Sequence, residues 1–115
     1  MVVDNLIELL DSFEYPVFRQ GSLAADAPYP DTFLTYWNND ESDHSSYDND
    51  TALADWMFQV NVYSTDPDKA YDLLAEARAL LKSAGYVIFD RGYDAASDEV
   101  SHTGRGMTVG YIESL

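Results

Sequence analysis

Residues 15–37 read Tyr15-Pro-Val-Phe-Arg-Gln-Gly-Ser-Leu-Ala-Ala-Asp-Ala-Pro-Tyr-Pro-Asp-Thr-Phe-Leu-Thr-Tyr-Trp37 and hold two aromatic-rich segments around a connector of Pro, Ala and Gly. The segment 32–37 is β-branched and aromatic, with apolar side chains on both sides, which is typical of a strand. A strand that is apolar on both sides needs cover on both faces of its sheet. Since the sequence contains only two convincing helices, we expect part of this sheet to be covered by another molecule.

The two helices are predicted from apolar side chains at helical spacing. Residues 2–13 form the first apolar stripe, and Pro16 ends that helix because the residue before proline avoids the α region. The second helix begins after Asp66, a good N-cap, with Pro67 in its first turn, and Gly85 is the expected left-handed terminator. Its predicted buried stripe consists of Ala70, Leu73, Leu74, Ala77, Leu80, Leu81 and Ala84.

The longest predicted strand is 51–65, where apolar and polar residues alternate so that one face belongs to the core. Its other face still carries Met57 and Tyr63. The segments 38–50 and 92–106 are polar and predict exposed connectors. The other predicted strands are 17–20, 32–37, 86–90 and 107–113.

The order of these elements predicts the fold class. Consecutive strands joined by short loops pair antiparallel, and helices interspersed with such strands form a separate layer. Residues 1–115 therefore predict a single α+β domain, with a mainly antiparallel β-sheet and two α-helices packed on one face.

Composition limits the classes of function. The chain has 115 residues, of which 46% are hydrophobic and 14% aromatic, so it is long and apolar enough for one folded core. It has no Cys, and its 21 acidic against six basic residues give a net charge of −15. Nucleic-acid binding needs clustered Lys and Arg, so the charge argues against it. Apolar runs of only a few residues predict no membrane span, and the first residues do not resemble a secretion signal.

Two segments invite a catalytic or metal-binding interpretation. His102 could act as a general base oriented by Asp98 or Glu99, but nothing nearby resembles a nucleophile elbow, and a loop histidine that bonds its own turn is the simpler interpretation. The acidic segment 40–50, with His44, offers carboxylates of the kind that hard cations prefer. It lacks the Gly and Glu positions of a calcium loop, so we expect no catalytic residue, metal or cofactor.

Three stretches, in this order and spacing, resemble the small tail-completion (tail terminator) proteins of long-tailed bacteriophages and prophages. They are Tyr15-Pro-Val-Phe-Arg-Gln-Gly-Ser-Leu23, Asp55-Trp-Met-Phe-Gln-Val-Asn-Val-Tyr-Ser-Thr-Asp-Pro67 and Gly92-Tyr-Asp-Ala-Ala-Ser-Asp-Glu-Val-Ser-His-Thr-Gly-Arg-Gly106. The resemblance spans about residues 5–113. It implies a structural virion protein, with helices on a sheet and no catalytic residues.

The same resemblance implies the partners and the location. Proteins of this family form rings, commonly hexamers, at the head-proximal end of the tail tube, and they join the tube to the head connector. The expected partners are therefore copies of the chain, the tail tube protein and a head-closure protein, in the virion and, during assembly, in the host cytoplasm. DNA would pass through an acidic ring without binding, since carboxylates repel phosphates.

A ring needs two different surfaces that meet between neighbours, and the aromatic strands and the isolated cations are candidates for them. We expect contacts at Arg19, Tyr36, Trp37, Met57, Tyr63, His102 and Arg105. Three other functions stay open: a head-closure or connector subunit of the same virion, an acidic mimic of DNA that inhibits a host protein, and an enzyme built around His102.

Overall fold

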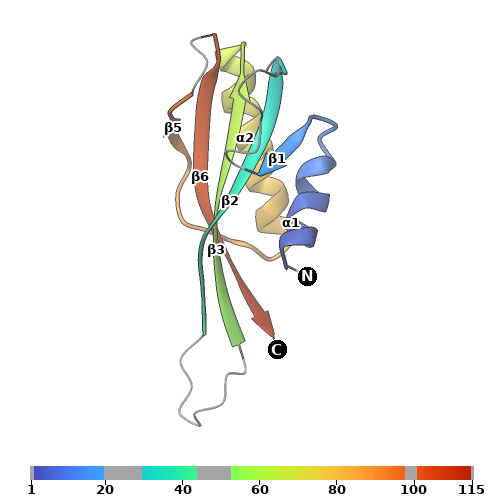
Figure 1. Ribbon diagram of the computed structural model, residues 1–115, viewed down its shortest axis with the longest axis vertical. Helices are drawn as coiled ribbons and strands as arrows, with labels where there is room; N and C mark the ends of the chain where they lie inside the picture. Colours follow the sequence, from blue (N-terminus) through green and yellow to red (C-terminus); the bar gives the residue numbers. More distant parts are fainter. Residues whose placement is uncertain (1, 20–29, 44–52, 98–100, 115) are drawn as a thin grey trace.

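The computed structural model describes residues 2–19, 30–43, 53–97 and 101–114. Figure 1 shows an elongated molecule in which long strands run beside two shorter helices. The elements in chain order are α1 (Val2–Asp11), β1 (Val17–Arg19), β2 (Thr32–Asp43), β3 (Leu53–Ser64), α2 (Pro67–Ser83), β4 (Val87–Ile88), β5 (Tyr93–Ala95) and β6 (Thr103–Ser114).

The strands form one sheet in the order β1-β2-β3-β6-β4, and β5 pairs with β6 beside this path. All pairs are antiparallel except β1 with β2, which run parallel with Val17 opposite Leu34. The α+β prediction with a mainly antiparallel sheet is confirmed. The prediction that consecutive strands pair antiparallel is wrong for β1 and β2, because residues 20–31 supply about the dozen residues that a return to the same end of a sheet needs.

Both helices pack on one face of the sheet, as predicted, and Figure 1 shows them side by side there. The apolar stripe of each helix meets the alternating apolar residues of the three long strands. Burying these side chains away from water contributes most of the stability of the fold. The central buried residues are Leu6, Leu10, Leu34, Phe58, Val60, Val62, Leu74, Leu81, Met107 and Val109.

Helix α2 has the predicted ends. The Asp66 carboxylate accepts a hydrogen bond from the backbone N–H of Asp68, and Gly85 has a φ of +97°. Leu80 is only half-buried and Ala84 is exposed, so the buried stripe is narrower than predicted. Helix α1 ends at Asp11, before the predicted residue 13, in a tight turn that continues to Glu14.

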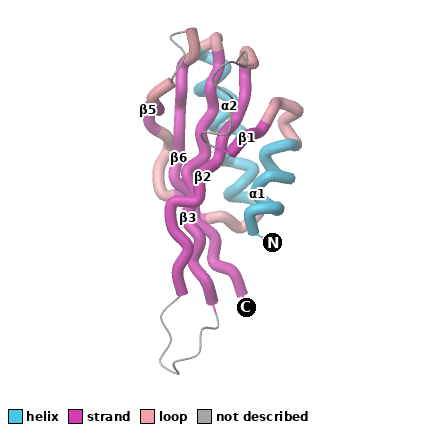
Figure 2. Tube along the Cα trace, in the orientation of Figure 1, coloured by secondary structure: helices cyan, strands magenta, loops and turns pink. Residues whose placement is uncertain are grey.

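Strand β2 is much longer than predicted and continues through Asn38 to Asp43, where a loop was expected. Asn and Asp disfavour strands, but every residue of this extension except Asn39 has a partner in β3, with a bulge between Asn38 and Asp40. Pairing with β3 thus overrides local preference. The lower ends of β2, β3 and β6 project beyond both helices (Figure 2), and we call residues 41–43, 53–56 and 111–114 the arm. The rest of the expected loop, 44–50, lies outside the described residues.

The predicted connector 92–106 is also partly wrong, because it contains β5 and the first residues of β6. Gly104 and Gly106 are of a residue type that favours turns, but both lie in strand pairs, opposite Tyr63 and Asn61 of β3. These glycines leave room for neighbouring side chains over the strand, so their small size serves packing, not a turn. Residues 98–100 lie outside the described part of the chain.

Candidate interaction surface

The sheet face that points away from the helices is the candidate functional surface, and we call it the open face. Strand alternation places Trp37, Met57, Gln59 and Tyr63 on it, opposite in direction to the core residues of the same strands. Within the described residues, no helix packs on this face. What covers its apolar side chains decides whether the face is sealed within the chain.

One end of the open face is sealed by its own aromatic side chains. Phe33 and Tyr63 are stacked with ring centres 5.1 Å apart and are only 2% and 5% exposed. Phe18 of β1 meets the Phe33 ring edge-on at 6.0 Å, and His102 lies 5.8 Å from it. Tyr63, predicted as an interface residue, is therefore a packing residue within the chain.

Strand β6 is also covered by rings of its own chain. A Cβ added to Gly104 would lie 2.8 Å from Cε1 of Tyr63, and one added to Gly106 would lie 3.0 Å from Cε2 of Tyr93. At Gly110 the corresponding distance to Cε2 of Phe89 is 2.9 Å. Glycine at these three positions lets aromatic rings lie directly on the backbone of β6.

The other end of the open face keeps exposed hydrophobic side chains around Gly110. Val87 lies opposite Gly110 in the β4–β6 pair, and Phe89 lies over it. Ile112, two residues further along β6, points the same way. These three side chains, here named the apolar patch, are 47%, 56% and 50% exposed, and they are three of the five exposed large hydrophobic residues in the described chain.

Trp37 is a fourth exposed hydrophobic residue, 42% exposed, and it stands on the open face beside β1. The guanidinium of Arg19 lies 5.6 Å from the centre of its ring. Two predicted contact residues are thus brought together as a cation–π pair. Tyr36, which lies opposite Arg19 in the β1–β2 pair, is half-buried against the core on the helix side.

Both ring nitrogens of His102 are engaged by polar atoms of its own chain. Its Nε2 lies 2.7 Å from the carbonyl oxygen of Pro30, and its Nδ1 lies 3.0 Å from Oγ of Ser101. Because a carbonyl only accepts, Nε2 donates in this contact. His102 therefore fastens the segment before β2 to the segment before β6. Asp98 and Glu99, its hypothetical orienting groups, lie outside the described residues.

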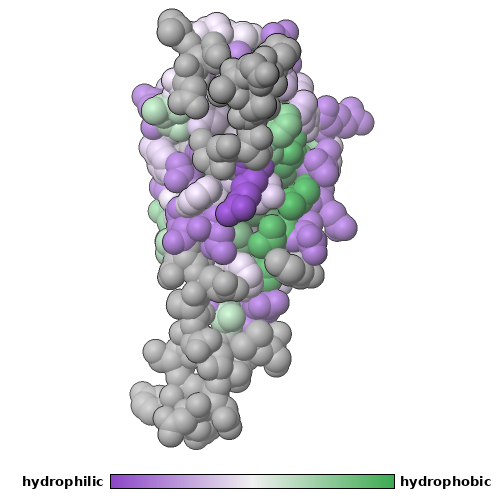
Figure 3. Space-filling view, in the orientation of Figure 1, coloured by the Kyte–Doolittle hydropathy of each residue, from purple (hydrophilic) through white to green (hydrophobic). Residues whose placement is uncertain are grey.

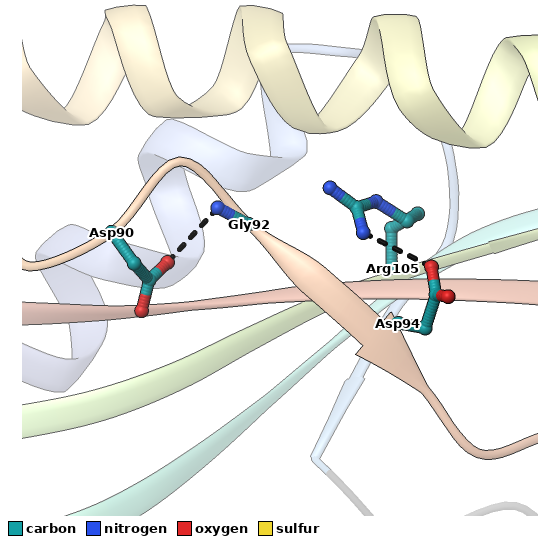
Figure 4. A network of polar contacts seen from close by, with 4 residues as sticks. All are labelled: Asp90, Gly92, Asp94 and Arg105. Carbon is teal, nitrogen blue, oxygen red and sulfur yellow. Dashed lines mark hydrogen bonds and ion pairs between the residues drawn. The ribbon is translucent and has the colours of Figure 1, made fainter.

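Arg105 points from β6 toward α2, so it lies on the helix side and not on the open face (Figure 4). Its guanidinium lies 4.4 Å from the centre of the Tyr71 ring and pairs with Asp94 of β5 at 3.0 Å. Its Nε is buried without a hydrogen-bond partner. Through these contacts Arg105 ties β5 to α2 within the chain. Nearby, the backbone N–H of Gly92, just before β5, donates to Asp90 at 3.1 Å.

The arm is acidic and has unpaired edges. Its residues 41–43, 53–56 and 111–114 include four acidic residues, Glu41, Asp43, Asp55 and Glu113, and no Lys or Arg. In the described chain, β1 pairs with β2 only up to Tyr36, and β4 and β5 pair with β6 only up to Gly110. The outer backbone groups of both strands beyond these points face outward, and such edges can pair with another chain.

Hydrophobic residues also gather on a second side of the molecule. Figure 3 shows a strip of them along the side where β1 and α1 lie, next to polar residues over the strands. The half-buried hydrophobic residues of α1, β1 and the turn between them are Val3, Leu9, Phe13, Tyr15 and Val17. The strip lies on different elements from the apolar patch.

One ionisable group has a strongly altered affinity for protons. Burial raises the pKa of Tyr86 to about 12, and the nearby Tyr111 adds to the shift. The Tyr86 hydroxyl donates to Oδ1 of Asn5 at 3.1 Å, which joins the segment after α2 to α1. This tyrosine lies under the helices, in the core, and is a structural residue.

The structure thus places the predicted contact residues in different surroundings. Trp37, Met57 and Arg19 lie on or beside the open face, whereas Tyr63 and Arg105 are used within the chain. Val87, Phe89, Tyr93 and Ile112 were not predicted as contact residues. In the described residues, no group of three His, Asp or Glu side chains is placed to hold a metal ion. No protein-family model and no curated protein matches this chain.

Proposed function

We propose that this chain is a structural protein of virion assembly, which caps the head-proximal end of a phage tail tube as a ring, commonly a hexamer, and joins the tail to the head. The observation that carries the proposal is the open face, where Val87, Phe89 and Ile112 stay exposed beside a projecting acidic arm. Exposed apolar clusters on a small domain mark protein–protein contacts. The resemblance of three stretches of the sequence supplies the identity of the partners.

A ring requires one surface of a subunit to meet a different surface of the next. The apolar patch and the strip along α1 and β1 are two such surfaces on different elements. The unpaired edges of β2 and β6 add a third means of contact, since a neighbouring strand can extend the sheet. These features support assembly and supply no chemistry for turnover.

Charge bears on how such a ring would form. Each subunit carries a net charge of −15, so free subunits repel one another, and salt screens that repulsion over about 10 Å at 0.1 M ionic strength. The end of a tube would act as a template that brings subunits together against this repulsion. An acidic lumen would also let DNA pass without adhering to the wall.

The experiment is electron microscopy of tails assembled with and without this protein. We expect overlong tails, or tails detached from heads, in its absence, and tails of normal length when the protein is added back. Normal attached tails in its absence would contradict the proposal. Binding to isolated virion components distinguishes a tail terminator from the closest alternative, a connector subunit. A terminator caps tail tubes, whereas a connector subunit binds portal-bearing heads. Capture of a host DNA-binding protein in place of virion proteins would favour the DNA mimic.

Neither helix in the described part of the chain is long and apolar enough to span a bilayer. The proposal places the protein in the virion and, during assembly, in the host cytoplasm. It requires no cofactor.

A further inference from the structure

The open face contains a shallow groove away from the apolar patch. It has a volume of about 440 Å³ and is lined by Trp37, Gln59, Asn61, Tyr63, Tyr93 and Asp94, with the last residue of β5 and the alanine after it. This volume lies within the range of about 300–1,000 Å³ that ligand sites occupy. We name it the aromatic groove.

Two aromatic side chains form the opposite walls of the aromatic groove. Trp37 stands on β2 and Tyr93 on β5, with β3 and β6 between them. Strands lie about 4.8 Å apart, and the Tyr93 ring leans inward over Gly106. The two rings therefore stand on the order of 10 Å apart, with a trough between them.

Both walls are held in place before any ligand arrives. The Tyr93 hydroxyl lies 3.4 Å from Oγ1 of Thr108, and its ring rests on Gly106. The Trp37 ring is held by the guanidinium of Arg19 at 5.6 Å. Rings that are already fixed lose little conformational freedom on binding, which favours affinity.

The floor of the groove requires a ligand with hydrogen-bonding groups. The side-chain amides of Gln59 and Asn61 lie there, with Nε2 of Gln59 donating to Oδ1 of Asn61 at 3.2 Å. The Asn61 side chain is already buried, at 2% exposure, so the half-buried Gln59 amide is the group that a purely apolar ligand would remove from water without compensation. A ligand that alternates flat apolar surfaces with carbonyl groups would match both the walls and the floor.

Charge further narrows the ligand. The Asp94 side chain is 82% exposed although its Oδ1 pairs with Arg105 toward the helix side, and the residue borders the groove at the β5 edge. The net charge of −15 disfavours anionic ligands, nucleic acids included. A ligand that carries Lys or Arg beside its flat apolar part fits this rim.

From these features we propose that the aromatic groove binds a proline-rich peptide segment that carries Lys or Arg. Such a segment adopts the polyproline II helix, which has low entropy, presents flat proline rings and leaves its carbonyls unpaired. Its three residues per turn and rise of about 3.1 Å per residue place every third proline on the same side, about 9 Å apart, so that successive flat rings can meet the two aromatic walls. The proposal does not depend on the virion role.

The test is a titration of the full chain with a synthetic acetylated peptide of six prolines followed by two lysines. Two-dimensional NMR of the ¹⁵N-labelled protein should show saturable shifts confined to residues that line the groove. The same peptide with alanine in place of proline should bind at least about tenfold more weakly, because the alanine chain is neither pre-ordered nor flat. Absence of saturable shifts, or shifts centred on the apolar patch, would overturn the proposal.

Substitutions test the contributions of the aromatic walls and of the rim residue Asp94 to peptide binding separately. Trp37→Ala should weaken binding about tenfold, as loss of an aromatic anchor does, while Ile112→Ala, which removes an exposed hydrophobic residue of the apolar patch, should leave affinity unchanged. Asp94→Asn should weaken binding of the lysine-containing peptide and not of six prolines alone. The assignment would be refuted if Asp94→Asn weakened the binding of both peptides equally. It would also be refuted if the native protein bound cellotetraose or maltotetraose more tightly than either peptide. Loss of peptide binding leaves tail capping testable, so the two proposals can fail separately.

Discussion

The ring of Tyr63 lies over Gly104 of the adjacent strand so closely that a Cβ at Gly104 would lie 2.8 Å from Cε1 of Tyr63 and 2.5 Å from the carbonyl oxygen of Ala95. The obstacle on one side is backbone, which cannot rotate away. This contact joins β3, β5 and β6, and it is one reason why half of the open face is sealed within a single chain.

Gly104→Ala should therefore lower the free energy of unfolding by about 1–3 kcal/mol, the usual range for a methyl group forced into a packed site. Urea unfolding followed by circular dichroism measures the change. Ala75→Ser, at an exposed position of α2, is the control and should leave the unfolding free energy within about 0.5 kcal/mol of the native value. If Gly104→Ala had the same unfolding free energy as the native chain, the Tyr63 ring and β6 could move apart without a loss of stability.

Arg105 should contribute through packing more than through its charge. Its partner Asp94 is 82% exposed, so Asp94→Asn should cost less than about 1 kcal/mol, as at other surface pairs. Arg105→Met removes the buried Nε that has no hydrogen-bond partner but keeps the bulk beneath Tyr71, and it should stay within about 1 kcal/mol of the native stability.

Arg105→Ala should be less stable than Arg105→Met, because it also loses the packing of the side-chain stem. Thermal unfolding of the three variants at low and at 1 M salt tests this order, since only the charge contribution is screened by salt. If Arg105→Met were as unstable as Arg105→Ala, and salt removed the difference from the native protein, the charge of Arg105 would matter more than its packing.

Tyr86 predicts a loss of stability at high pH. Its pKa is raised to about 12 in the folded protein, from an ordinary value of 10.0. Below pH 10 both states hold the proton, so the stabilisation is complete. As the pH rises from 10 to 12 the unfolded chain releases this proton and the folded one keeps it, so unfolding becomes easier by about 1 kcal/mol per pH unit.

Urea unfolding at pH 8 and pH 11 measures this slope, and Tyr86→Phe isolates it from the other tyrosines. The variant loses the hydrogen bond to Asn5, which should cost about 1 kcal/mol at pH 8, yet its stability should fall less between the two pH values. Parallel losses in both proteins would mean that Tyr86 ionises normally in the folded state.

Phe89 should matter for assembly and little for folding. Its side chain is 56% exposed on the apolar patch, so Phe89→Ser should change the free energy of unfolding by less than about 1 kcal/mol. We expect the variant to lose the ability to cap isolated tail tubes, counted by electron microscopy. Tyr71→Ser, which removes a residue that is 51% exposed on α2, is the matched control and should cap normally. Equal capping by both variants would exclude the apolar patch as the contact.

The parts of the fold that could be predicted are those governed by local rules. The ends of α2 follow from Asp66, Pro67 and Gly85, whose side-chain and backbone preferences act within a few residues. The core face of β3 follows from strict alternation. In each case the deciding interaction is local, or repeats with a fixed period, and so it can be read from the sequence alone.

The parts that failed depend on residues far apart in the sequence. Asn38 to Asp43 resemble a loop, and only their pairing with β3 makes them a strand. Gly104 and Gly106 resemble turn residues, and their role is visible only when Tyr63 and Tyr93 lie above them. The groove wall at Tyr93 could not be predicted for the same reason, whereas Trp37 was predicted because its own strand already showed apolar side chains on both sides.

The position of β6 has a consequence for how the chain is made. This strand, 103–114, pairs with β3 on one side and with β4 and β5 on the other, so most of the sheet remains incomplete until it has left the ribosome. Pairing between segments so distant in sequence is slow and leaves apolar strands open while they wait. We expect nascent chains that stop before residue 103 to be held by chaperones or degraded, because the sheet cannot form without β6.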